Sequence, residues 1–132
     1  MDAKWWEIYY PEVEKEFTGE RVSSEYKGKV NSMGQVPNFC NSGAAILTLA
    51  ASRGATKIIM VGYDCQKTNG QAHHHGDHPK GLGNAGSVGK WPDQFKKASA
   101  YLQRKGVKVL NASRVTLLTC FERVPLDNAL SE

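Results

Sequence analysis

The feature that most constrains the fold is residues 57–62, Lys-Ile-Ile-Met-Val-Gly, in which four apolar residues follow one another without interruption. A continuous apolar run of this length is typical of a parallel strand that is covered on both faces. The sequence on each side favours a helix. Residues 44–53 are rich in Ala and Leu, and residues 91–104 carry apolar side chains at the 3.6-residue spacing of one helix face.

Two further segments favour strands, residues 20–24 and residues 107–110. The order strand, helix, strand, helix, strand predicts a right-handed parallel βαβαβ unit. Residues 26–38 are expected to form an irregular loop, and residues 116–130 a turn and a short helix. We therefore expect one α/β domain over residues 1–132, a small three-layer Rossmann-like unit with a short parallel sheet of about three strands flanked by helices.

The charge of the chain argues against a dedicated nucleic-acid-binding protein. Seventeen Lys and Arg residues against thirteen Asp and Glu residues give a net charge of +4, but the basic residues are scattered along the chain. The three cysteines, Cys40, Cys65 and Cys120, are widely spaced and odd in number, so we expect reduced thiols and not a disulfide framework. No apolar stretch approaches the ~20 residues of a membrane span, and the N-terminus lacks a secretory signal, so we expect a cytoplasmic protein.

Residues 1–18 are expected to form an N-terminal helix that Pro11 ends or kinks. Its clustered aromatic residues are Trp5, Trp6, Tyr9 and Tyr10. So dense a cluster needs a surface that buries it. It either packs on the sheet or faces a partner.

Polar residues follow the strands at the edge where parallel α/β sheets bind their ligands. These residues are Gly62, Asp64, Asn111 and Ser113. The helix start Asn41-Ser42-Gly43 provides a good N-cap and free N–H groups for an anion such as a phosphate. The loop that follows residues 20–24 can return this helix start to the same edge.

All four histidines lie between His73 and His78, within a long glycine-rich segment over residues 67–90. A loop of this length in a small domain is normally functional or disordered. Its H-x-H-x-D-H spacing suits a divalent metal such as zinc, manganese or iron, with Cys65 as a further candidate ligand. The candidate metal ligands are His73, His75, Asp77 and His78.

The H-x-H-x-D-H spacing resembles that of metallo-β-lactamase-fold hydrolases, in which such residues hold a metal pair that activates water. The context here differs, because no apolar strand precedes the motif and no histidine follows His78. General acid–base catalysis is a second interpretation, since an imidazole over a ligand site can move a proton near neutral pH. A solvent-exposed polar loop is the third. The candidate catalytic residues are His73, His75 and His78.

Several motifs occur in an order that resembles a known group of proteins. They are Asn41-Ser42-Gly43, the strand 57–62 with Tyr63-Asp64, residues 73–79, Trp91 with Phe95, and the segments 106–113 and 117–121. The pattern resembles phage "norphogenetic"-type proteins. It is similar, more distantly, to bacterial sialyltransferase-like and hydroxymethylpterin pyrophosphokinase-like proteins. The resemblance covers roughly residues 38–130.

The resemblance to the sialyltransferases implies a pocket for a cytidine nucleotide or nucleotide-sugar, with a loop histidine as base. The implied nucleotide-binding residues are Asn41, Ser42, Gly43, Gly62, Asp64, Asn111 and Ser113. Those transferases begin with a nucleotide-binding half for which this sequence shows no counterpart. The short sheet is therefore expected to leave an open edge, covered by a second copy of the chain or by a host protein.

Two functions follow from these expectations. The first is a nucleotide-binding transferase, or the remnant of one. The second is a non-catalytic phage-encoded protein that binds and modulates a host protein in the host cytoplasm, for example to inhibit a defence. A metal-dependent hydrolase acting through the histidine loop is a further alternative.

Overall fold

The computed structural model describes residues 3–67, 70, 78, 82 and 86–131. Its centre is a three-stranded parallel sheet with the order β3-β4-β5. The strands are β3 (Lys57–Met60), β4 (Lys108–Asn111) and β5 (Glu122–Arg123). Ile58 pairs with Val109, and Leu110 pairs with Glu122. The parallel pairing of β3 and β4 through a crossover helix confirms the predicted α/β class.

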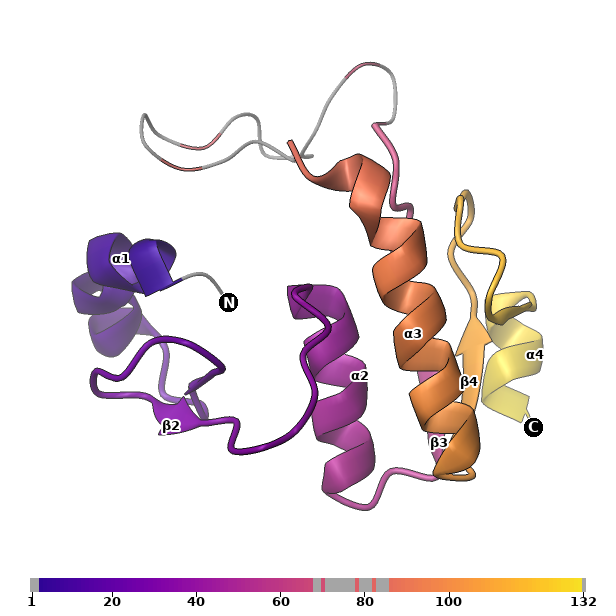
Figure 1. The fold of residues 1–132 in the computed structure, drawn as a ribbon, viewed down its shortest axis with the longest axis horizontal. Helices are drawn as coiled ribbons and strands as arrows, with labels where there is room; N and C mark the ends of the chain where they lie inside the picture. The colour runs from indigo at the N-terminus through magenta and orange to yellow at the C-terminus, as the bar shows by residue number, and fades with distance from the viewer. Residues whose placement is uncertain (1–2, 68–69, 71–77, 79–81, 83–85, 132) are drawn as a thin grey trace.

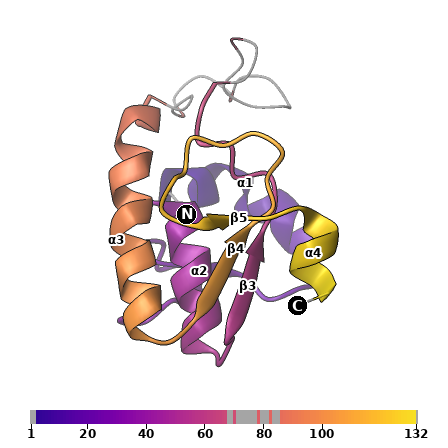
Figure 2. The ribbon, with the colours of Figure 1, turned by 90° about the vertical axis from the view of Figure 1, so that its right-hand side faces the viewer.

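Helices flank this sheet on both sides (Figures 1 and 2). On one side lie α2 (Ser42–Ser52) and α3 (Trp91–Arg104), with α3 following the 3-10 turn η1 (Val88–Lys90). The short helix α4 (Leu126–Ser131) lies on the opposite side, where the Lys57 ammonium donates a hydrogen bond of 2.6 Å to the Ala129 carbonyl. None of the described helices combines the length and apolar character that a membrane span requires.

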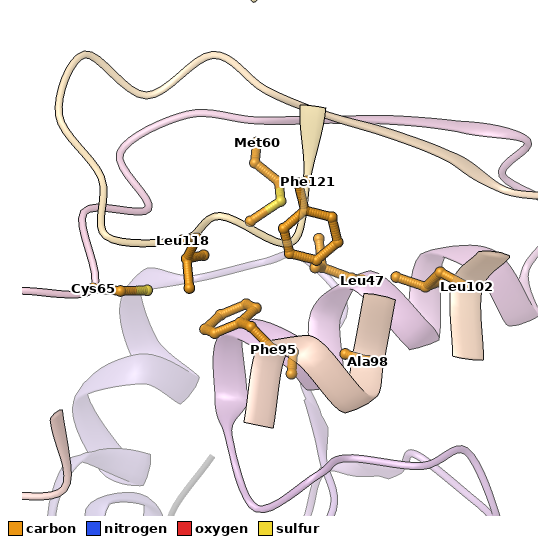
Figure 3. Close-up of a cluster of buried hydrophobic side chains, with 9 residues drawn as sticks. Leu47, Met60, Cys65, Phe95, Ala98, Leu102, Leu118 and Phe121 are labelled. Atoms are coloured by element: carbon orange, nitrogen blue, oxygen red, sulfur yellow. The ribbon is translucent and has the colours of Figure 1, made fainter. Parts of the chain in front are cut away.

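The main core lies between the sheet and the helices α2 and α3 (Figure 3). Phe95 of α3 is 1% exposed, and its ring contacts the edges of two other rings. The centroid distances are 5.7 Å to Tyr63 and 6.3 Å to Phe121. Small residues allow this approach, because Ala44 on α2 and Ala98 on α3 are completely buried between the helices and the sheet.

The predicted third strand of the sheet is wrong. Residues 20–24 contribute β1 (Val22–Ser23), which pairs in parallel with β2 (Asn31–Ser32) in a separate two-stranded sheet. The third strand of the central sheet is instead β5, which lies within the segment predicted to form a turn and a short helix. Strands of two residues carry no recognisable alternation, so their pairing depends on tertiary contacts.

The N-terminal helix α1 (Ala3–Glu16) continues through Pro11, where the sequence predicted an end or a kink. Its aromatic residues pack on the loop between β1 and β2 instead of on the central sheet. The Trp6 and Tyr26 rings stack at 6.1 Å, and the Tyr10 hydroxyl donates to the Lys29 carbonyl at 3.2 Å. Figure 1 shows α1 well separated from β3 and β4, so these aromatic residues do not cover the edge of the sheet.

Candidate functional site

A cavity of about 840 Å³ opens at the carboxyl end of β3. Four parts of the fold meet there: the segment that follows β1, the N-terminus of α2, the segment that follows β3, and the start of α3. Of the residues implied for nucleotide binding, the cavity is lined by Asn41, Ser42, Gly43, Gly62 and Asp64. The helix start and the strand end thus line one cavity, but not by the predicted route, because β1 is not part of that sheet.

Hydrogen bonds hold the N-terminus of α2 against α3. The Asn41 side-chain oxygen accepts from the Ala44 amide at 3.1 Å, which caps the helix. The Asn41 side-chain amide donates to the Gln94 oxygen at 3.0 Å, and Gln94 in turn donates to the Cys40 carbonyl at 3.2 Å. The first amides of a helix have no acceptor within it. The amides of Ser42 and Gly43 are thus placed at the cavity with the positive end of the helix dipole.

The chain enters α2 through a constrained turn. Phe39 and Cys40 both adopt left-handed backbone conformations, with φ of 52° and 56°. Non-glycine residues rarely adopt this conformation, and surrounding contacts must maintain it. The Thr48 hydroxyl provides one such contact by donating to the Pro37 carbonyl at 2.6 Å. The turn places the Asn41 cap and the Cys40 carbonyl where Gln94 can reach both.

The segment after β3 is held by the segment after β4. Gly62 has a φ of 75°, which lets the backbone turn sharply as the strand ends. The Tyr63 amide then donates to the Ser113 hydroxyl at 2.8 Å, and the Tyr63 carbonyl accepts from the Thr116 hydroxyl at 2.6 Å. These two bonds fix the backbone that carries Asp64 into the cavity.

Asn111 and Ser113 lie behind this cavity. Asn111 is completely buried and Ser113 is 4% exposed. The Asn111 side-chain oxygen accepts from the Ser113 amide at 3.0 Å, and its amide donates to the Thr116 hydroxyl at 3.4 Å. The two residues lie at the expected edge of the sheet, but their side chains brace the loop after β3.

Aromatic side chains that the sequence analysis did not assign to the site form one wall of the cavity. They are Tyr63, Trp91 and Phe95. The Trp91 indole N–H donates to the Ser87 hydroxyl at 3.1 Å, which orients the ring at the start of α3. Burial raises the pKa of the Tyr63 hydroxyl above its ordinary value of 10.0, so this side chain is neutral at physiological pH.

Gly43 allows the helix, the strand segment and this aromatic wall to approach closely. A Cβ built on Gly43 would lie 2.9 Å from Phe95 Cζ and 3.1 Å from Tyr63 Cε1. Such distances are shorter than ordinary van der Waals contact. Only glycine therefore fits at this point without displacement of a ring.

The predicted histidine chemistry lies largely outside the described residues. His73, His75 and Asp77 belong to the part of the chain that the structure does not describe, whereas His78 is described and half-buried. Within the described residues, no group of three or more His, Cys, Asp or Glu side chains could hold a metal ion. Cys65 is buried in the core, where desolvation, and secondarily the Asp64 carboxylate, raises the pKa of its thiol to about 11.

No family model matches this sequence, and no similar protein was found among curated proteins or solved structures. The fold and the cavity define the molecule at the level of class. It is an α/β protein with a parallel sheet and a ligand-sized cavity at the carboxyl end of the first strand of that sheet.

Proposed function

We propose that the cavity binds a nucleotide or nucleotide-sugar on a Rossmann-like scaffold of the sialyltransferase-like kind. The observation that carries the proposal is the meeting of the α2 N-terminus with the carboxyl end of β3 in one cavity of about 840 Å³. Parallel α/β sheets bind ligands at this edge, and a cavity of this size suits a small molecule.

The amides of Ser42 and Gly43 suit a phosphate group. Free N–H groups and the helix dipole both favour an anion at this point. Asp64 suits a different part of the ligand, since its carboxylate repels phosphate but accepts hydrogen bonds from sugar hydroxyls.

The aromatic wall suits a nucleobase. Trp91 and Tyr63 both line the cavity and are both partly exposed. Stacking of a base on an aromatic side chain contributes about 1–3 kcal/mol and is compatible with every base. The wall therefore supports affinity, and base preference is expected to come from polar groups of the lining.

The proposed reaction is transfer of a sugar or nucleotidyl group, and the loop histidines are the proposed bases on the strength of the sequence. These residues are His73, His75 and His78. A divalent ion such as zinc or manganese, bound by the same loop together with Asp77, is the proposed cofactor. We place the reaction in the cytoplasm, which for a phage-encoded chain is that of the host.

A second candidate function is binding to another protein, and the edge of the sheet favours it. In the described part of the chain, β3 has a strand partner only on its β4 side. Val61, directly after this strand, is 59% exposed. Unpaired strand edges are templates for pairing with another chain. A second copy of the chain or a host protein is the proposed partner.

Binding of nucleotides by the purified full chain tests the first function. We expect CMP, CDP or a CMP-sugar to stabilise the protein by about 2.7 kcal/mol at a hundredfold excess over Kd. Cytidine without phosphate is expected to bind more weakly, because it lacks the group that contacts α2. Trp91→Ala is expected to weaken binding at least tenfold, whereas Trp5→Ala on α1 serves as the matched control. Absence of stabilisation by any nucleotide, with or without a divalent ion, would refute the proposal.

A pull-down from host lysate tests the second function. The chain is expected to capture a partner, and Val61→Lys is expected to abolish capture because it charges the exposed end of β3. His78→Ala is the control that leaves this edge intact. Capture that survives Val61→Lys would remove β3 as the interface.

A further inference from the structure

A second cavity, of about 900 Å³, lies at the same edge of the sheet. It is formed by the segments that follow the three parallel strands, and it reaches the start of α4. Figure 2 shows β3, β4 and β5 ending together beneath the loop that joins β4 to β5. Its lining includes Gly62, Asp64 and Ser113, which the sequence analysis assigned to a nucleotide, but its arginines and apolar residues have no role in the proposed nucleotide site.

Two arginines and one carboxylate, that of Asp64, line the second cavity, so the charged residues of this lining carry a net positive charge. Arg123 at the end of β5 donates from Nη2 to the Ser113 carbonyl at 3.2 Å and to the Arg114 carbonyl at 2.9 Å. Its guanidinium is therefore fixed by the backbone, and Arg114 stands exposed beside it. Within the residues that the structure describes, neither arginine forms an ion pair with a carboxylate. Guanidinium groups in this situation are well suited to carboxylates and phosphates.

Apolar side chains surround these charges. Val61, Val115 and Leu126 line the cavity although they are 59%, 52% and 42% exposed. These three residues come from the segments after three different strands, and the fold gathers them at one place. Grouped exposed apolar side chains are typical of a ligand or interaction site.

We propose that the second cavity binds a small organic anion. Its carboxylate or phosphate group contacts Arg114 and Arg123, and its apolar body contacts Val61, Val115 and Leu126. A purely apolar ligand would leave two guanidinium charges uncompensated at the contact. An inorganic anion alone would leave the apolar side chains uncovered.

The two cavities are adjacent. Gly62 and Asp64 line both of them, so Asp64 stands between the proposed nucleotide and the proposed anion. The Asp64 carboxylate is thus shared by the linings of both cavities. Binding of the anion does not require the nucleotide, and the two proposals can fail separately.

Calorimetric titration of the full chain with benzoate and phenyl phosphate tests the inference. We expect both anions to bind. Benzyl alcohol, which lacks the anionic group, and inorganic phosphate, which lacks the apolar body, are expected to bind at least tenfold more weakly. Arg114→Gln is expected to weaken both anions at least tenfold. Arg104→Gln, which removes an exposed arginine from the end of α3, is the matched control and is expected to leave their Kd unchanged.

A second variant tests the apolar part of the second cavity and shows whether the anions bind at another site. Val115→Asp adds a negative charge at an exposed position of the cavity and is expected to abolish binding, while Leu130→Asp on the exposed face of α4 is expected to have no effect. If phenyl phosphate binds equally well to wild type, Arg114→Gln and Val115→Asp, it occupies another site and the inference is wrong. Equal affinity for benzoate and benzyl alcohol would also overturn it. If the chain binds benzoate but no nucleotide, the proposed nucleotide-binding function is refuted and the inference about the second cavity stands.

Discussion

Substitution of Gly43 by alanine separates two opposing physical effects at the candidate nucleotide site. Alanine has a higher helix propensity than glycine, and in α2 this favours the variant by up to about 1 kcal/mol. The new methyl group, however, would lie 2.9 Å from Phe95 Cζ and 3.1 Å from Tyr63 Cε1. The sign of the net effect depends on whether those rings can move away.

The structure indicates that they cannot move cheaply. Phe95 is 1% exposed and is held between the edges of Tyr63 and Phe121. Extra carbon atoms in a well-packed core typically cost about 1–3 kcal/mol. Setting this cost against the propensity gain, we expect Gly43→Ala to lose about 1 kcal/mol of stability, which for a chain of this size lowers Tm by about 4 °C.

A double-mutant cycle provides the assay. Urea unfolding followed by circular dichroism is measured for wild type, Gly43→Ala, Phe95→Leu and the double variant. Because leucine vacates the position of Phe95 Cζ, we expect the double variant to be more stable than the sum of the single effects, by at least about 0.5 kcal/mol. Gly89→Ala is the matched control, since a Cβ there meets no atom within 4 Å.

The reasoning is refuted if Gly43→Ala is as stable as Gly89→Ala, or if the cycle is additive within about 0.3 kcal/mol. Either result would mean that the aromatic wall yields without cost. The same variant also bears on function. The methyl group presses on Tyr63 and Phe95, which line the cavity, so nucleotide affinity is expected to fall if these rings shift.

Further predictions concern the cysteines and the contact that joins the N-terminal segment to α2. Iodoacetamide at about pH 8 is expected to modify exposed Cys40 and to spare Cys65, whose pKa burial raises to about 11; equal rates by mass spectrometry would contradict the buried position. Since the unfolded thiol ionises near 9.0, the contribution of Cys65 to stability is complete below that pH and is lost as the pH rises towards 11, and Cys65→Ser should make this decline in urea stability shallower. Hydrogen bonds from Arg53, at 2.6 and 2.7 Å, hold the pKa of Glu20 below 4.5, so their contribution is complete above that pH and is lost as the pH falls through the lower folded value. Glu20→Gln should therefore increase the amide hydrogen exchange of the residues that precede α2 at neutral pH. The same increase in Glu16→Gln would contradict a specific contact between Glu20 and Arg53.

The helices α2 and α3 and the strands β3 and β4 could be predicted, because the residues of each element specify it. Apolar spacing in 91–104 matches α3, and the uninterrupted apolar run in 57–62 contains β3. The start of α2 was also predictable, because Asn41 is a strong N-cap and its side chain performs that role. With these elements in place, the meeting of a helix start and a strand end follows from the geometry of a parallel sheet.

Other features could not be predicted from local pattern. The strands β2 and β5 have two residues each, which is too short for any periodicity to register, and the partner of β1, predicted as a strand over residues 20–24, was equally hidden. The burial of Asn111, a polar residue at the end of a strand, depends on acceptors and donors that the next loop provides. For this reason the sequence alone suggested a ligand contact where the structure shows a brace.

The second cavity is a clear case of a feature that depends on tertiary contacts and not on local sequence. Nothing in the spacing of Arg114 and Arg123 distinguishes them from the other basic residues of the chain, and only the pairing of β4 with β5 brings them together. By itself the sequence determined where the helices α2 and α3 and the strands β3 and β4 form, because propensity, capping and periodicity act within a few neighbouring residues. The tertiary structure alone decided which strands pair, which polar groups are buried and where cavities open, because these depend on contacts such as that between Tyr63 and Ser113, 50 positions apart along the chain.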